Sequence, residues 1–151
     1  MRELTSQIEF DGTPSEVWDV LADLPSYGEW NPFMREIAGE VRVGARLRVQ
    51  LAPIGERGIT MHPTVLVAEP GRELRWLGHL LLPRIFDGEH VLEIQEVRPG
   101  RVRFLQHERF RGVLLPLLWK KLREGGTAKG FAAMNDALAA RVASRRAQSV
   151  S

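Results

Sequence analysis

The chain opens with an alternation of polar and apolar residues that predicts a β-strand. In Glu3–Phe10 the apolar side chains of Leu4, Ile8 and Phe10 all stand at even positions, so one face of the strand is buried. Asp11–Gly12 follows as a turn. The pattern is typical of an edge strand with one face on the core.

Two short helices are predicted next. Thr13 and Pro14 form a helix start, because a threonine side chain caps free N–H groups and proline needs no N–H at the first position. Pro25 ends this helix, and Tyr27–Trp30 can form a second one. The apolar stripe of the first helix consists of Val17, Trp18, Val20, Leu21 and Leu24.

The middle of the chain has the pattern of a series of strands separated by glycine and proline. The turn sequences Glu69–Arg72 and Arg98–Arg101 both contain Pro-Gly, in which proline presets one turn position and glycine permits positive φ. Strands joined by such short turns are antiparallel neighbours. The predicted strands are Met34–Ala38, Ala45–Leu51, Gly58–Glu69, Glu73–His79, Glu89–Val97 and Val102–Arg111.

The last third of the chain carries a helical pattern. Alternating spacings of three and four residues predict a long amphipathic helix whose stripe consists of Ala128, Phe131, Asn135, Leu138 and Val142. We expect it to start late or kink at Gly125–Gly126 and to fray from Ser144 onward. Strands in the middle with helices gathered on one side of the sheet form an α+β architecture.

The two strands before the last helix place polar side chains on the predicted buried face. Arginines fill odd positions of the second strand, whereas even positions of the two strands carry Leu92, Ile94, Val102, Phe104 and Phe110. The even face is therefore the interior. The same phase turns three polar side chains inward, those of His90, Gln106 and Glu108.

Two registers bring His90 and Glu108 within reach of each other. A five-residue loop around Pro99–Gly100 pairs His90 with Glu108 and Leu92 with Gln106, whereas a three-residue loop leaves His90 and Glu108 diagonal. A buried carboxylate is costly unless it is paired. The pair therefore either fixes the strand register or forms the polar end of a ligand cavity, where it orients a hydroxyl or carbonyl or acts as acid and base.

Composition and motifs exclude several classes of function. The 151 residues include no cysteine, which excludes disulfides, thiolate nucleophiles and sulfur-ligated metals. The four histidines lack metal-binding spacing, no serine has a nucleophile-elbow context, and no glycine-rich phosphate loop is present. We therefore expect no metal and no cofactor. The net charge of +2 is dispersed along the chain, so we expect no nucleic-acid partner.

The N-terminus lacks the apolar stretch of a signal peptide, and no apolar run approaches the ~20 residues that span a bilayer. We expect a cytoplasmic protein without stable membrane insertion. It should consist of a single domain over residues 1–147 and a short polar tail over 148–151.

Several segments together resemble a known superfamily. They are Glu16–Leu21, Asp23–Tyr27, Trp30–Phe33, Glu69–Trp76, Phe86–His90, Glu108–Gly112 and Gly130–Leu138. The chain is similar over essentially its whole length to the polyketide cyclase/dehydrase-like branch of the START and pollen-allergen-like superfamily, SRPBCC. The resemblance implies a helix-grip fold, in which a seven-stranded curved antiparallel sheet wraps around the C-terminal helix and encloses a deep apolar cavity. Such folds serve lipid carriers, hormone receptors, aromatase-cyclases and hydrolase activators, so the activity stays open.

We expect the cavity to be lined by Trp30, Phe33, Trp76, Leu92, Phe104, Gln106, Phe110, Trp119, Phe131, Met134 and Asn135. Most of these side chains would serve equally well as plain core. Asn135 is the exception, because an amide on an apolar stripe needs a partner.

Two strongly apolar segments, Leu80–Pro83 and Val113–Trp119, fall where the rim of the cavity is expected. They can close over a ligand or form a homodimer contact. With the cations that follow the second segment, they can also dock on an anionic membrane.

Three functions remain. The first is binding or transport of a small hydrophobic molecule, such as a lipid, a polyketide or an aromatic metabolite. The second is a cyclase or dehydratase in which His90 and Glu108 exchange protons. The third is a co-chaperone-like interaction protein that uses the apolar rim.

Overall fold

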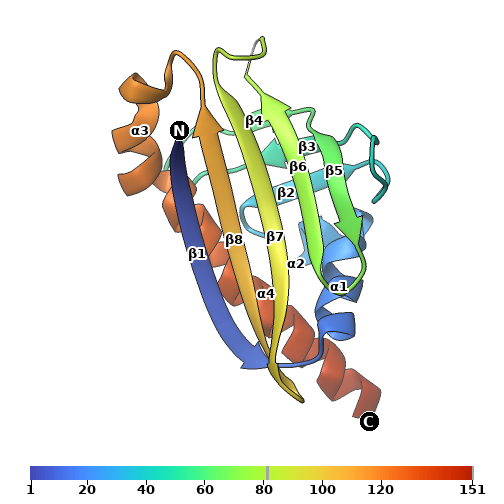
Figure 1. The fold of residues 1–151 in the computed structure, drawn as a ribbon. Helices are drawn as coiled ribbons and strands as arrows, with labels where there is room; N and C mark the ends of the chain where they lie inside the picture. The colour runs from blue at the N-terminus through green and yellow to red at the C-terminus, as the bar shows by residue number, and fades with distance from the viewer. Residues whose placement is uncertain (81, 151) are drawn as a thin grey trace.

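A computed structural model gives the fold of the chain and describes residues 1–80 and 82–150. The larger sheet is antiparallel and has five strands in the order β1-β8-β7-β6-β5 (Figure 1). Its strands are β1 (Arg2–Asp11), β5 (Thr64–Glu69), β6 (Glu73–His79), β7 (Asp87–Arg98) and β8 (Arg101–Arg111). A smaller sheet consists of β2 (Met34–Ala38), β3 (Arg48–Leu51) and β4 (Ile59–Met61). The predicted edge position of the first strand is confirmed.

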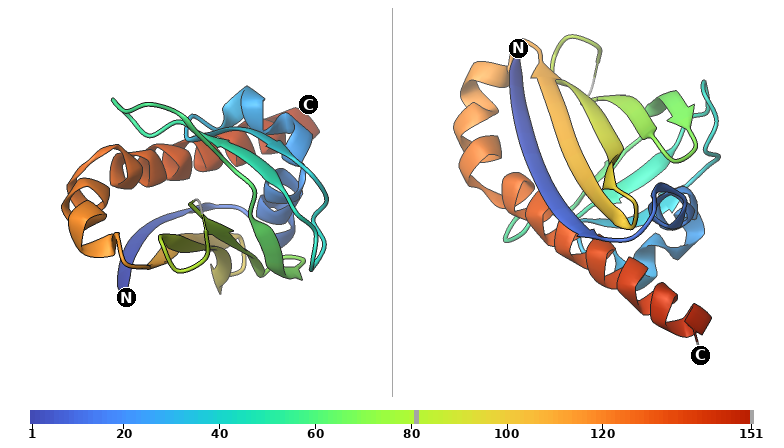
Figure 2. Two further views of the ribbon diagram at one scale, coloured as in Figure 1. Left: turned by 90° about the horizontal axis from the view of Figure 1, so that it is seen from above. Right: turned by 60° about the horizontal axis from the view of Figure 1, so that its bottom comes forward.

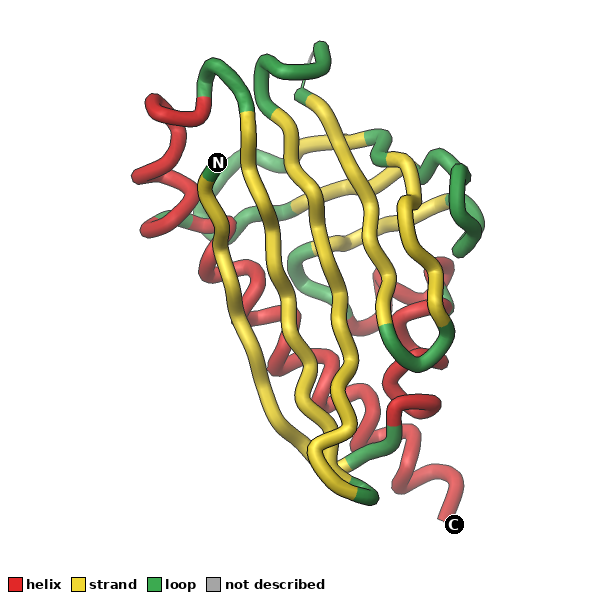
Figure 3. Tube along the Cα trace, viewed as in Figure 1, coloured by secondary structure: helices red, strands yellow, loops and turns green. Residues whose placement is uncertain are grey.

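The helices gather on one side of the five-stranded sheet, as Figures 1 to 3 show. They are α1 (Pro14–Ala22), a 3-10 turn (Leu24–Ser26), α2 (Tyr27–Trp30), α3 (Leu115–Glu124) and α4 (Gly126–Val150). The small sheet and α4 face the same side of the large sheet, so the core lies between them. This α+β arrangement confirms the helix-grip fold. In the part of the chain that the structure describes, no helix is both long and apolar enough to cross a membrane.

Within the described residues, the predicted single sheet of seven strands is instead divided into two sheets with eight strands. The division falls within the predicted strand Gly58–Glu69, which breaks at Pro63 into β4 and β5. Proline has no N–H to donate to a ladder. The Pro63 carbonyl accepts a hydrogen bond from Leu47 N at 2.8 Å, and Val65 N donates to Ala45 O at 2.8 Å. The segment before β3 thus joins the two sheets through these hydrogen bonds. The pairing of β3 with β2 begins only at Arg48.

The register of β7 and β8 is the one that a five-residue loop predicts, with His90 opposite Glu108 and Leu92 opposite Gln106. The loop itself is shorter than expected. β7 extends to Arg98 and pairs with Arg101 around the two-residue turn, and a register shift between Glu96 and Arg98 accommodates the extra residue. A β-bulge of this kind preserves the phase that keeps even positions inside.

The helix start at Thr13 forms as predicted. Glu16 N donates to Thr13 Oγ1 at 3.2 Å, and Thr13 N donates back to Glu16 Oε1 at 2.9 Å, a capping box. The helix ends at Ala22, before Pro25, because residues 24–26 form a 3-10 turn that leads into α2.

The last third of the chain contains two helices where one was predicted. The apolar segment after β8 supplies the first half of α3, Gly125 ends this helix, and α4 begins at Gly126. The expected fraying is wrong, because α4 continues through the predicted polar tail to Val150. Gly130 lets this helix approach Phe33, just before β2, closely, since a Cβ at this position would overlap the Phe33 ring.

Tyr27 is the only tyrosine of the chain and is completely buried. Its hydroxyl donates to Leu21 O at 2.7 Å, which fastens the start of α2 to the end of α1. Burial, and secondarily the nearby Asp23 carboxylate, raises the pKa of this phenol above its usual range.

We predict that Tyr27 ionises only when the protein unfolds. The fold favours the protonated phenol, so this group stabilises the protein fully below the unfolded pKa of ~10, and the stabilisation is lost as the pH rises above it. Alkaline titration followed by tyrosinate absorbance should show a signal that appears together with unfolding measured by circular dichroism. Tyr27→Phe should abolish the signal. Tyrosinate absorbance with a usual midpoint in the folded protein would contradict the prediction.

Candidate functional site

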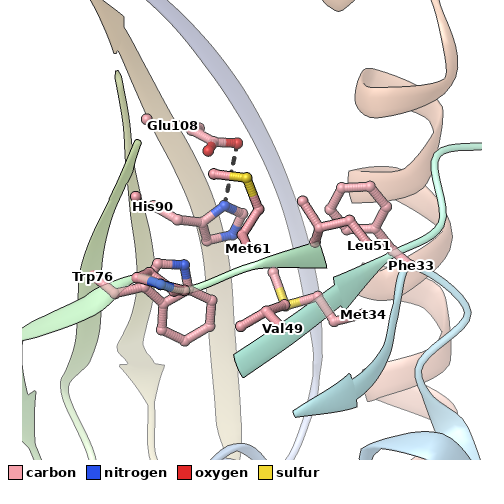
Figure 4. Close-up of a pocket in the computed structure, with 11 residues that line it drawn as sticks. Phe33, Met34, Val49, Leu51, Met61, Trp76, His90 and Glu108 are labelled. Atoms are coloured by element: carbon pink, nitrogen blue, oxygen red, sulfur yellow. Dashed lines mark ion pairs between the residues drawn. The ribbon is translucent and has the colours of Figure 1, made fainter. Parts of the chain in front are cut away.

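A cavity lies between the inner face of the five-stranded sheet and the small sheet (Figure 4). Its inner part has a volume of about 30 Å³ and an adjoining outer part has about 90 Å³. The two parts share wall residues, namely Phe33, Leu51, Met61, Gly88 and Glu108. The inner part ends at Trp76 and His90, and the outer part is walled by Leu80, Phe86, Phe110 and Leu122.

The cavity is smaller than the resemblance implies. Sites for drug-sized ligands have ~300–1,000 Å³, whereas an apolar cavity of ~150 Å³ holds a single benzene ring. Side chains of the small sheet and its neighbours occupy the remaining space: Figure 4 shows Phe33, Met34 and Met61 facing the strands that carry His90 and Glu108.

Glu108 and His90 form the polar end of this cavity. Glu108 Oε2 lies 3.3 Å from His90 Nδ1, and the dashed line in Figure 4 marks this contact. The imidazole is buried, whereas the carboxylate is partly accessible. The imidazole stacks on Trp76 with ring centroids 5.6 Å apart, and Phe131 meets it edge-on at 5.1 Å. Two aromatic rings therefore hold the imidazole in one orientation.

A chain of buried hydrogen bonds continues from His90 to the opposite side of the core. His90 Nε2 lies 3.1 Å from Gln106 Oε1. Gln106 Nε2 donates to Phe131 O at 3.0 Å and to Asn135 Oδ1 at 2.7 Å, and Asn135 Nδ2 donates to Ser6 Oγ at 2.9 Å. The network joins β7, β8, α4 and β1, and it supplies the partner that the Asn135 amide needs.

This network fixes the proton on His90. The Phe131 carbonyl can only accept, so the Gln106 amide must turn its nitrogen to α4 and its oxygen to His90. His90 Nε2 therefore carries a hydrogen. Its Nδ1 faces a carboxylate oxygen, and that contact is favourable only when a proton lies on one of the two groups. An imidazole nitrogen and a carboxylate oxygen therefore face each other at the cavity wall.

Gly88 makes room for the carboxylate. A Cβ at this position would lie 2.7 Å from Glu108 Oε1, and Gly88 pairs with Gly78 of the neighbouring strand. Sequence reasoning missed both glycines and the methionine side chain of Met61. A glycine at an inward even position such as 88 is a usable signal, because it marks a point where a strand leaves space. Met61 carried no such signal.

The structure brings only some of the predicted lining residues to the cavity: Phe33, Trp76 and Phe110, with His90 and Glu108. Gln106 and Asn135 lie in the hydrogen-bond network. The residues that pack in the core outside the lining are Leu92, Phe104, Phe131 and Met134. Trp30 packs against Tyr27 with ring centroids 5.1 Å apart, and Trp119 meets Phe110 edge-on at 6.4 Å.

A family model described as polyketide cyclase/dehydrase and lipid transport matches residues 1–145. The chain belongs to this family. No curated protein matches the sequence significantly. Among the residues described, no group of three or more His, Asp or Glu side chains could hold a metal ion.

Solved structures share the fold of this family member at low sequence identity. The Zhui aromatase/cyclase from a Streptomyces species is 14% identical, with a TM-score of 0.72 over 95% of this chain and 94% of that one. A START superfamily protein from Mycobacterium smegmatis is 14% identical, with a TM-score of 0.71 over 94% and 97%. Norcoclaurine synthase from Thalictrum flavum, in complex with dopamine and hydroxybenzaldehyde, is 14% identical, with a TM-score of 0.72 over 95% and 87%. These likenesses concern the fold alone.

We predict that Gln106→Met destabilises the protein by about 3 kcal/mol, because it leaves the His90 Nε2–H and the Asn135 Oδ1 buried without partners. Urea unfolding followed by tryptophan fluorescence measures the change. Gln7→Met is the matched control, since Gln7 is exposed on β1 and its replacement should stay within about 0.5 kcal/mol. Equal unfolding midpoints for the two variants would contradict the role of Gln106.

Proposed function

We propose that the protein binds a small aromatic molecule carrying a hydrogen-bond donor, with the ring in the cavity and the donor on Glu108. The observation that carries the proposal is a carboxylate oxygen at the wall of a mostly apolar cavity. Within the described residues, no group donates to Glu108 Oε1, which faces the space beside Gly88. An unpaired acceptor in apolar surroundings gains most from a ligand that brings its own donor.

Cavity size supports a ligand of about one ring. The two adjoining parts, of about 30 and 90 Å³, approach the volume that holds benzene. A polyketide or a long acyl chain would require the outer wall to move, because such ligands need several times this space.

The chemistry of the cavity favours a ligand with a neutral or cationic hydrogen-bond donor over a ligand with an acid group. The walls offer the aromatic faces of Phe33, Trp76 and Phe110, which suit a flat apolar ring. A ligand carboxylate would meet the Glu108 carboxylate, and like charges at short range repel strongly in apolar surroundings. Dopamine and hydroxybenzaldehyde, which occupy the norcoclaurine synthase of similar fold, are both single-ring molecules with hydroxyl groups.

A second candidate is acid–base catalysis of the cyclase or dehydratase type. The 3.3 Å separation of His90 Nδ1 and Glu108 Oε2 supports it, since a positioned acid or base accelerates such steps by about 10²–10⁴. The similar fold of an aromatase/cyclase agrees with this class. Binding takes precedence because the same His90 contacts also satisfy a structural need of the core.

Calorimetric titration with matched probes tests the proposal. 4-Methylphenol and toluene share ring and methyl group, and only the phenol has a donor. We expect the phenol to bind at least tenfold more tightly. Glu108→Gln should weaken phenol binding about tenfold, because a charged acceptor is the stronger one, and should leave toluene unchanged.

The exposed Glu96 of β7 provides the control variant, Glu96→Gln, which should bind both probes as the parent protein does. Equal affinities of phenol and toluene would overturn the role of Glu108, and failure of both to bind would overturn the ligand class. Turnover of a polyketide-type substrate that Glu108→Gln abolishes without loss of binding would favour the enzyme.

A further inference from the structure

One end of the fold exposes large apolar side chains. The segment after β6 and the segment before α3 meet there, because Val113 N donates to Arg84 O and Leu114 N to Ile85 O, both at 3.1 Å. Leu82, Val113 and Leu117 are 66%, 70% and 80% exposed; we call these three residues the apolar tip. Figure 1 shows both segments at the end of the sheet that lies farthest from the C terminus.

Positive charge surrounds the apolar tip. Lys120 and Lys121 follow Leu117 by three and four residues, so they lie on the same face of α3, about one turn further along. Arg84 is exposed on the neighbouring segment. Of the residues described, no acidic side chain lies within ion-pair distance of Lys120 or Arg84, and Lys121 reaches only Glu56, at 3.9 Å. Most of this charge is therefore available to a partner.

We propose that the apolar tip docks on an anionic phospholipid surface. An apolar edge backed by cations one helical turn away matches the depth profile of a bilayer, in which acyl chains lie ~5–10 Å below the anionic headgroups. Val113 and Leu117 enter the boundary of headgroups and acyl chains, and Lys120 stays at the phosphates. A second copy of the chain fits less well, because a twofold contact would bring the same uncompensated cations of both copies together.

The docked surface would lie beside the cavity. The elements that carry the apolar tip also supply the outer cavity wall, through Leu80 and Phe86 on one side and Leu122 of α3 on the other. A membrane at this end therefore contacts the part of the fold through which an apolar molecule would pass. Docking itself requires only the tip and its charges, so it is independent of what the cavity binds.

Vesicle flotation tests the proposal with the full chain. At low ionic strength we expect binding to vesicles of phosphatidylglycerol and phosphatidylcholine, little binding to phosphatidylcholine alone, and release by salt. Val113→Asp should weaken binding at least tenfold, since it places a charge where an apolar side chain enters the boundary. Lys120→Gln should weaken it about fivefold, the effect of one cation at such a surface.

Val43→Asp is the matched control. Val43 is 59% exposed in the loop between β2 and β3, and it lies outside the apolar tip. It should bind as the parent protein does, and all variants should keep the parent melting temperature, since the replaced side chains are exposed. Absence of binding to anionic vesicles, or equal loss in Val43→Asp and Val113→Asp, would overturn the proposal. It would also be overturned by a solution dimer that Val113→Asp dissociates, which would make the tip a contact between copies.

Discussion

The arrangement of the site depends on a single buried amide, that of Gln106. Its nitrogen donates to the Phe131 carbonyl of α4, which can only accept a hydrogen bond. Its oxygen must therefore point to His90. This amide ties the centre of the five-stranded sheet to α4, and Asn135 extends the link to β1. Buried polar groups are costly unless every member is satisfied, so the network both fixes the helix against the sheet and sets one tautomer of the imidazole.

The features of the cavity follow from this constraint. Because His90 Nε2 is committed to Gln106, Nδ1 alone remains to face Glu108 at the cavity wall. Because Gly88 has no side chain, no Cβ crowds the second carboxylate oxygen of Glu108. The fold thus places the pair of Glu108 and His90 at the wall of a mostly apolar space of limited size, and the proposed ligand class rests on this arrangement.

The alternation of inward and outward side chains along a strand was enough to predict which polar residues point inward. Along β7 and β8 this alternation is unambiguous at His90, Gln106 and Glu108. The correct register was among the two predicted, but nothing local marks the bulge near Val97 that produces it. The partner of Asn135 and the wall position of Met61 depend on packing between segments distant in sequence. Periodicity carries no information about such contacts. The break at Pro63 could have been read from the missing N–H, and α3 from the spacing of its apolar residues.

The protonation of His90 is the most direct test of this account. A long-range proton–nitrogen correlation spectrum of the histidine side chains, assigned with a His90→Gln variant, reports which ring nitrogen carries hydrogen. The account predicts hydrogen on Nε2 and an Nδ1 resonance that shifts when Glu108 is replaced by Gln. A neutral imidazole with hydrogen on Nδ1 and a bare Nε2 would contradict it, because Gln106 could not then be oriented by Phe131.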